Sequence, residues 1–170
     1  LLDDSVSEGL SAAAGLFDVT DRDILYARNL HERLYPASTT KILTAYLALK
    51  YGDLNASATV SSEALNLDSG SSTCGLSVGD TLTLEQLLYC LLMSSGNDAA
   101  NVIAEAVSGS QEEFVNLMNP EALSLGATNS HFVNAHGLHD EQQYTTVYDL
   151  YLFFRAALSN ELFAQIINTK

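Results

Sequence analysis

Ser38 and Lys41 stand three residues apart, just after Pro36 and at the expected start of a helix. Residues i and i+3 share a helix face, with β-carbons about 5–6 Å apart, so the serine hydroxyl and the lysine amine can meet over the first turn. A serine hydroxyl is a weak nucleophile until a base takes its proton. The spacing therefore predicts a nucleophile with its own base.

Lys41 can act as that base only when it is uncharged, and the unperturbed pKa of lysine is about 10.4. Burial beside the apolar faces of Ile42 and Tyr46 would lower this pKa. The positive end of the helix would also lie close to developing negative charge. A helix cap followed by a solvated cation would give the same spacing. The chain has only three lysines. Lys41 lies in an apolar segment, just after the helix start that Pro36 favours, and this position favours a catalytic role over a solvated cation.

A second polar group, Ser95-Gly96-Asn97, interrupts an apolar run that is otherwise continuous from Leu87 to Ala100. As a simple turn, it would let Asn97 cap the following helix. As part of a catalytic site, it would present the Ser95 hydroxyl to relay a proton to a leaving amine. The Asn97 carboxamide would then orient the lysine and a peptide carbonyl.

The elements that must position these groups are one hairpin followed by a helical body. Apolar runs at 10–19 and 24–28 around a polar turn predict a β-hairpin. Apolar periodicity and caps predict helices from about 38 to 52, at 84–93, from about 98 to 109, from 110 to 126, from 147 to about 158, and from about 161. Thr83 and Gln86 form a capping box, and Pro120 should kink or split its helix. Two strands alone are marginal in water, so further strands are expected.

Length and composition exclude several classes of protein. With 170 residues and 47% hydrophobic content, the chain can form one domain with a real core. A net charge of −14 argues against nucleic-acid binding. No apolar run approaches the roughly 20 residues that cross a bilayer. Residues 1–5 show no signal peptide, and no membrane anchor is visible.

The cysteines and histidines indicate neither a disulfide framework nor a metal site. Cys74 and Cys90 fit no zinc pattern, and a bridge between them stays open because sequence cannot show proximity. His136 and His139 match no familiar ligand spacing. We therefore expect no metal and no cofactor, with the histidines serving as loop hydrogen-bonding groups.

Serine, two residues and lysine, followed later by serine-x-asparagine, is the signature set of penicillin-binding proteins and class A β-lactamases. The surrounding residues resemble one family more closely, the D-alanyl-D-alanine carboxypeptidases (S11 peptidases). Three stretches carry this resemblance: RLYPASTTK at 33–41, LYCLLMSSGNDAA at 88–100 and TNSHFVNAHGL at 128–138. The similarity extends from about residue 12 to 170.

The resemblance implies an α+β, β-lactamase/transpeptidase-like fold with a helical body packed on an antiparallel sheet. The resemblance also implies that Ser38 would attack the carbonyl between two terminal D-alanines of a peptidoglycan stem peptide and form an acyl-enzyme. Lys41 would take the proton, Ser95 would pass one to the departing D-alanine, and Asn97 would hold the substrate amide. β-Lactams would enter the same path and stall as acyl-enzymes. Such a substrate implies export to the cell envelope, in the periplasm or on the outer face of the cytoplasmic membrane.

The family's third motif, Lys-Thr-Gly on a later strand, has no counterpart here, because Lys170 is not followed by Thr-Gly. We therefore expect residues 1–170 to be a catalytic domain truncated before its C-terminal strands, with an incomplete sheet and little activity. Two alternatives remain. A β-lactamase would need an acidic residue beside the site, and Glu63, Glu112 and Glu121 match no such loop. The second alternative is a catalytically silent peptidoglycan-binding fragment.

Overall fold

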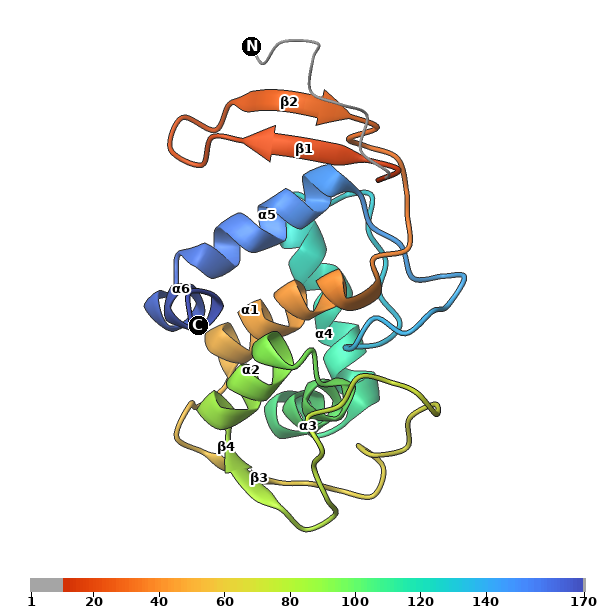
Figure 1. The fold of residues 1–170 in the computed structure, drawn as a ribbon, viewed down its shortest axis with the longest axis vertical. Coiled ribbons are helices and arrows are strands. Elements are labelled where there is room, and N and C mark those ends of the chain that lie inside the picture. The colour runs from red at the N-terminus through yellow and green to blue at the C-terminus, as the bar shows by residue number, and fades with distance from the viewer. Residues whose placement is uncertain (1–10, 170) are drawn as a thin grey trace.

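In the computed structural model, which describes residues 11–169, a body of helices separates two small antiparallel sheets (Figure 1). The fold is α+β, as the sequence predicts. Along the chain the elements are β1 (Ala14–Phe17), β2 (Ile24–Arg28), the 3-10 turn η1 (Ala37–Thr40), α1 (Lys41–Tyr51), β3 (Ser57–Thr59), β4 (Thr81–Thr83), α2 (Leu84–Met93), α3 (Asn97–Ser108), α4 (Gln111–Ser124), α5 (Val147–Leu158) and α6 (Glu161–Ile167).

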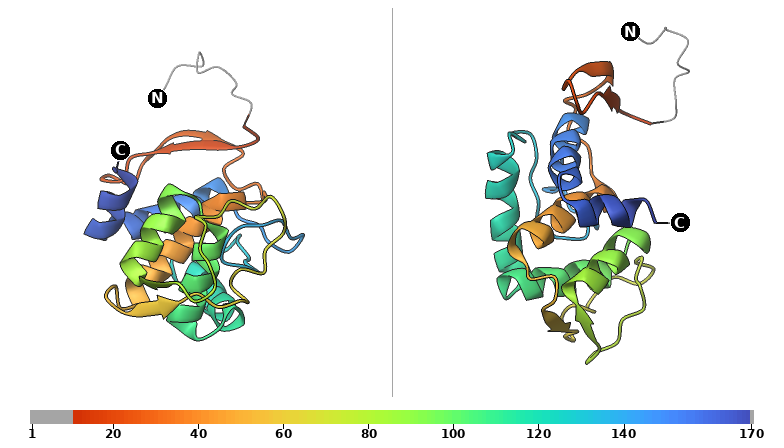
Figure 2. Two further views of the ribbon diagram at one scale, coloured as in Figure 1. Left: turned by 60° about the horizontal axis from the view of Figure 1, so that its bottom comes forward. Right: turned by 90° about the vertical axis from the view of Figure 1, so that its left-hand side faces the viewer.

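The predicted hairpin is confirmed as the antiparallel pair β1–β2, with Ala14 opposite Arg28 and an irregular register between Leu16 and Phe17. It lies against α5 (Figures 1 and 2). The Phe17 ring stacks on the Tyr151 ring of α5, with centroids 4.1 Å apart. A lone hairpin is marginal in water, so this contact with a helix supplies part of the support that the hairpin needs. The run predicted at 10–19 includes Leu10, which lies outside the described residues.

The second sheet, β3–β4, falls in a segment for which the sequence predicts only a loop. Ser57 pairs with Thr83 and Thr59 with Thr81. Each strand is three residues long and offers a single apolar residue, Ala58 or Leu82, so neither shows the alternation that reveals a strand. The pairing comes instead from the chain's return to the start of α2, where Leu84 N donates to Ala56 O at 3.1 Å.

The predicted helices are all present, and side-chain caps explain the starts of α2, α4, α5 and α6. The Thr83–Gln86 capping box is complete at α2. Ser110, Thr146 and Asn160 cap α4, α5 and α6 through their side chains. Of the two effects expected of Pro120, a split of the helix is wrong, because α4 runs unbroken across it, and a kink stays a prediction. Its buried residues Phe114, Met118 and Ala122 fix both halves of the helix on the core.

The core is centred on α1, which lies between α5 on one side and α2 and α3 on the other (Figures 1 and 2). Leu43 and Leu47 of α1, Leu87 and Leu91 of α2 and Ile103 of α3 are fully buried. Packing on every side fixes the axis of α1 and therefore the position of its first turn. No helix within residues 11–169 combines the length and apolarity that spanning a membrane requires.

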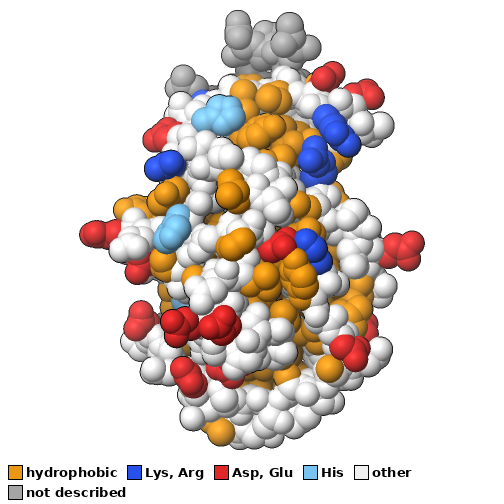
Figure 3. All heavy atoms as spheres, turned by 180° about the vertical axis from the view of Figure 1, so that it is seen from behind, with side chains coloured by type: hydrophobic (Ala, Val, Ile, Leu, Met, Phe, Trp, Pro, Cys, Tyr) orange, Lys and Arg blue, Asp and Glu red, His pale blue; other side chains and the backbone are white. Residues whose placement is uncertain are grey.

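Charged side chains are unevenly distributed over the face turned away from the view of Figure 1. Figure 3 shows basic side chains in the upper and middle parts of this face, and acidic side chains from its upper part, near the hairpin, down to its lower part, where no basic side chain accompanies them. Exposed apolar residues of the hairpin, Leu16, Val19, Ile24 and Leu25, add hydrophobic surface to the molecule. On this face, the acidic side chains are therefore dispersed rather than confined to one patch.

Candidate active site

Ser38 and Lys41 meet over one turn, as their spacing predicts. Ser38 lies in η1, and Lys41 is the first residue of α1. Lys41 Nζ lies 3.3 Å from Ser38 Oγ. Ala37, directly before the serine, has a φ of 48°, which is unfavourable for a residue with a side chain. The serine is exposed, whereas Lys41 is only 2% exposed. A substrate can therefore reach the hydroxyl, while water has little access to the amine.

Two further oxygens fix the amine of Lys41. Asn97 Oδ1 and the backbone oxygen of His136 each lie 2.7 Å from Nζ. A protonated lysine has three N–H donors and can serve all three oxygens around it. A neutral amine keeps two donors for the two acceptors at 2.7 Å, which leaves its lone pair facing the Ser38 hydroxyl. This arrangement suits transfer of the serine proton to the lysine.

The environment of Lys41 also makes the neutral form accessible. Burial lowers the pKa of Lys41 to about 8, against the smaller opposing effect of the negative charge of Asp98. Loss of hydration disfavours the charged form of any buried amine. The amine therefore titrates close to neutral pH, where a general base is most effective.

Asn97 begins α3 but does not cap it. Gly96 occupies the N-cap position and contributes no side-chain hydrogen bond. Asn97 is 4% exposed, its backbone N–H donates to Ser72 O at 2.8 Å, and its carboxamide oxygen accepts from Lys41. The interpretation of Asn97 as a simple helix cap is therefore wrong, and its carboxamide orients the lysine.

Ser95 lies two residues before Asn97, in the turn between α2 and α3. It is half-buried and has a φ of 54°. Among the hydrogen bonds of residues 11–169, none joins the Ser95 hydroxyl to Ser38 or Lys41. The fold thus brings Ser38, Lys41 and Asn97 into one hydrogen-bonded group. Ser95 is not part of this group, and it is not among the residues that line the cavity at Ser38.

The loop at 133–139 supplies the His136 carbonyl and depends on residues that the sequence does not reveal. Gln143, which is 1% exposed, accepts from Val133 N and Asn134 N, each at 3.0 Å, and donates to Thr40 Oγ1 at 3.3 Å. Thr44 of α1 donates to Ala135 O at 2.7 Å. These contacts fasten the loop to η1 and the first turn of α1. The only sequence signal for the loop is the family resemblance of residues 128–138.

Gly137 brings this loop into direct contact with the backbone at Ala37 and Ser38. Its φ is 93°, and a β-carbon on it would lie 1.9 Å from Ala37 O and 3.1 Å from Ser38 N. Only a glycine can combine this conformation with such a close approach.

Asp98, next to Asn97, fixes the loop at 70–76. Its carboxylate is 1% exposed and accepts backbone N–H bonds from Cys74, Gly75 and Leu76 at 3.0–3.1 Å. Burial alone would raise the pKa of Asp98, but the hydrogen bonds from Cys74, Leu76 and Ala99 outweigh it and hold the pKa below its usual range. An ionised carboxylate thus anchors the loop to the start of α3.

A cavity of about 350 Å³ opens over the Ser38 hydroxyl. Its walls come from η1, the start of α3 and the loops around residues 70 and 137. No carboxylate lines it, and neither sheet of the described residues contributes to it. The lining residues are Tyr35, Ala37, Ser38, Gly70, Ser71, Ser72, Asn97, His136, Gly137, Leu138 and His139.

His136 lines this cavity as a neutral imidazole. Burial, and then the positive charge of Lys41, lower the pKa of His136 to about 4. Its Nδ1 accepts a hydrogen bond from Leu138 N at 3.0 Å, which stabilises the turn. Within residues 11–169, no three histidine, cysteine or acidic side chains are grouped as metal ligands.

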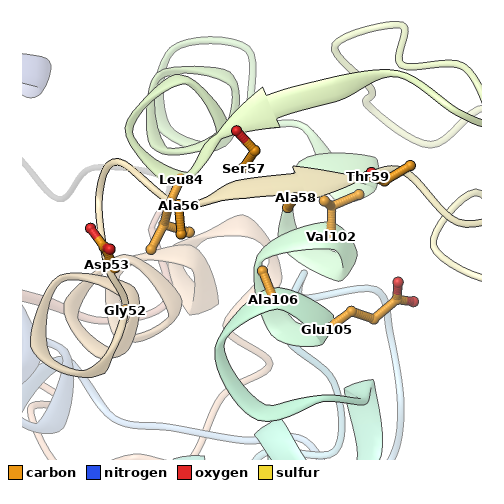
Figure 4. Close-up of a pocket in the computed structure, with 10 residues that line it drawn as sticks. All are labelled: Gly52, Asp53, Ala56, Ser57, Ala58, Thr59, Leu84, Val102, Glu105 and Ala106. Atoms are coloured by element: carbon orange, nitrogen blue, oxygen red, sulfur yellow. The ribbon is translucent and has the colours of Figure 1, made fainter.

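A separate pocket of about 220 Å³ lies between the end of α1, β3 and α3 (Figure 4). Asp53 and Glu105 stand apart along its wall. Glu105 already accepts hydrogen bonds from Ser61 and Gln111. No lysine, arginine or histidine accompanies the hydroxyls of Ser57 and Thr59 in the lining, so this pocket lacks the amine or imidazole base that would activate a serine or threonine nucleophile.

Comparisons with known proteins agree with these features. A family model described as D-alanyl-D-alanine carboxypeptidase matches residues 5–170. The chain is 38% identical over 149 residues to the D-alanyl-D-alanine carboxypeptidase DacF of Bacillus subtilis (strain 168), which covers 86% of this chain and 38% of that protein.

Solved structures show the same similarity in three dimensions. A D-alanyl-D-alanine carboxypeptidase of Mycobacterium tuberculosis H37Rv superposes with a TM-score of 0.88 at 35% identity, over 94% of this chain and 60% of that one. Penicillin-binding protein 6B of Escherichia coli gives a TM-score of 0.83 at 32% identity, over 88% and 50%. The chain thus spans between about two fifths and three fifths of the length of these relatives.

Proposed function

Since the chain belongs to the D-alanyl-D-alanine carboxypeptidase family, we propose that it forms the acylation site of a serine D-Ala-D-Ala carboxypeptidase. The proposed substrate is a peptidoglycan stem peptide ending in D-Ala-D-Ala, and the proposed location is the cell envelope. The hydrogen-bonded group of Ser38, Lys41 and Asn97 carries the proposal, because it pairs an exposed hydroxyl with a buried amine of lowered pKa.

Ser38 Oγ attacks the carbonyl carbon of the terminal peptide bond while its proton passes to Lys41 Nζ. The hydrogen bonds from the amine to Asn97 Oδ1 and His136 O, both 2.7 Å, keep its lone pair directed at the serine. The peptide bond then breaks, and the departing D-alanine amine receives a proton through Ser95. The Asn97 amide group holds the substrate, and water finally hydrolyses the ester on Ser38.

β-Lactams are proposed to acylate the same hydroxyl. Their ring carbonyl offers the electrophile that the stem peptide offers, but the leaving amine stays tethered to the acyl group. The resemblance to a penicillin-binding protein supports this part of the proposal.

The β-lactamase alternative is less well supported, because it requires a carboxylate beside the nucleophile to activate the deacylating water. The cavity over Ser38 contains no Asp or Glu. Glu121 is instead paired with Lys50 at 2.7 Å, and Glu112 lines a different pocket, beside Val115.

Covalent labelling with a fluorescent penicillin tests the function. The full-length gene product should carry one label per molecule, and the Ser38→Ala variant none. A matched control, Ser61→Ala, removes a hydroxyl remote from the cavity and should label normally. Absence of labelling in the folded full-length protein would contradict the proposal and favour a silent peptidoglycan-binding protein.

A further inference from the structure

The fold brings the chain's two cysteines to the same glycine. Cys74 lies in the loop at 70–76, and Cys90 lies in the last turn of α2. Gly96 N donates to Cys90 O at 3.2 Å. The position that a β-carbon would take on Gly96 is 3.0 Å from Cys74 Sγ. Because Gly96 has no side chain, the loop cysteine can approach the helix that carries the other cysteine.

The Cys90 thiol is also close enough to Cys74 to affect its pKa. Both cysteines are free thiols and are partly buried. Cys74 Sγ donates to Asp98 Oδ1 at 3.3 Å. Burial, then the neighbouring Cys90 thiol, and then the negative charge of Asp98 raise the pKa of the Cys74 thiol. The proposed hydrolysis uses neither thiol, so their proximity needs another explanation.

We propose that Cys74 and Cys90 form a redox site, a dithiol that a disulfide oxidant converts into an intramolecular disulfide tying the loop at 70–76 to the end of α2. This inference goes beyond the proposed function and does not depend on it.

The exchange balances without a metal or cofactor. The Cys90 thiolate attacks one sulfur of the oxidant, which forms a mixed disulfide and releases the first oxidant thiol. Cys74 then attacks the Cys90 sulfur and displaces the second. Two electrons pass to the oxidant, and the two thiol protons end on its released thiols. We assign Cys90 as the attacking residue because burial and Asp98 disfavour the thiolate of Cys74.

The disulfide would stiffen the wall of the Ser38 cavity without rebuilding it. Asp98 holds the loop through the backbone N–H groups of Cys74, Gly75 and Leu76, and none of these bonds needs a thiol. Ser72, whose carbonyl holds Asn97 N at 2.8 Å, lines the same cavity. Oxidation therefore adds a covalent restraint to a loop that is already in place, and it restricts the unfolded chain as well.

The test uses the folded protein, fully reduced and then titrated with oxidised glutathione at pH 8. We expect the intact mass to fall by two hydrogen atoms with no glutathione adduct, both thiols to become unreactive, and dithiothreitol to restore them. Amide hydrogen exchange at residues 74–76 should slow several-fold in the oxidised protein, because local opening then requires a cross-linked loop to move.

Two single variants serve as controls. Cys74→Ser should stop at a stable glutathione adduct on Cys90, because no second thiol is present to displace it. Cys90→Ser should react more slowly, through the buried Cys74 alone. Folded wild-type protein that keeps two free thiols, accumulates only glutathione adducts, or forms disulfides only between molecules would overturn the proposal. These readouts involve no substrate, so they are independent of whether the proposed carboxypeptidase function holds.

Discussion

Asn97 Oδ1 lies 2.7 Å from Lys41 Nζ, although the two residues are 56 positions apart in the chain. The bond joins the first turn of α3 to the first turn of α1 in the interior of the helical body, where both side chains are buried. It gives one N–H of the amine a fixed acceptor. It therefore helps to determine toward which neighbour the lone pair of the neutral amine points. The predictions below test the consequences of this geometry for the base, for its titration and for the loop that completes its surroundings.

Replacing Lys41 with arginine should abolish acylation while preserving a positive charge. Arginine stays protonated in proteins, so it cannot take the serine proton. Loss of a general base costs about 100- to 10,000-fold in rate, and labelling by fluorescent penicillin should slow by that factor. Lys50→Arg is the matched control on the same helix, where Lys50 is exposed and paired with Glu121. Rapid labelling of Lys41→Arg would rule out the lysine as the base.

The acylation rate should rise with pH up to about 8 and then level off. Only neutral Lys41 can accept the proton, and its pKa is lowered to about 8, so well below that pH the neutral fraction falls tenfold for each unit. Second-order labelling rates between pH 5.5 and 9.5 measure this directly. A rate that is flat across the range would mean that the amine does not titrate during acylation.

Stability should increase with pH between about 8 and 10.5. The folded pKa of Lys41 is about 8 and the unfolded value is 10.5, so the unfolded state binds more protons in this window and unfolding becomes less favourable as pH rises. The shift corresponds to about 3 kcal/mol in the free energy of unfolding. This stability is fully present above pH 10.5 and is lost as the pH falls through 8. Urea unfolding of wild type and Lys41→Met, each at pH 7 and pH 10.5, isolates this contribution. Equal changes in both proteins would contradict it.

Asn97→Asp should move the acylation profile to higher pH. A carboxylate at the position of Oδ1 would lie beside the amine of Lys41, stabilise its charged form and raise its pKa. Labelling at pH 7 should slow by about tenfold for each unit of the shift, with partial recovery above pH 9. Asn101→Asp is a control on the same helix, because Asn101 is buried but bonds Ala64 O instead of the lysine. An unshifted profile would show that Asn97 does not set the protonation of Lys41.

Gly137→Ala should destabilise the protein and slow acylation together. The added methyl group would overlap the Ala37 carbonyl, at a backbone φ of 93°. Gly109→Ala controls for strain, because Gly109 has a φ of 85° with open space around it. Positive φ at alanine costs about 1 kcal/mol, and overpacking adds about 1–3 kcal/mol. The free energy of unfolding measured in urea should therefore fall further in Gly137→Ala than in Gly109→Ala. Equal losses of stability in the two variants would show that the loop can accommodate the added methyl group without disturbing Ser38.

The sequence alone determined those features whose causes are local. Ser38 and Lys41 meet because three residues make one helical turn, and the helix starts at Thr83, Ser110 and Thr146 follow from side chains that bond backbone groups three residues away. The hairpin follows from two apolar runs around a polar turn. The pattern of the two motifs and their flanking residues was also enough to identify the family.

Only the tertiary structure decided how the lysine is held and what surrounds it. The His136 carbonyl is a backbone atom with no signature in the sequence, and it reaches Lys41 because Gln143, Thr44 and Gly137 fix its loop against α1. The β3–β4 pairing, the anchoring of the 70–76 loop by Asp98 and the proximity of Cys74 to Cys90 arise in the same way. Each joins segments distant in sequence, and such contacts are selected by the packing of the whole core rather than by the propensity of any one segment.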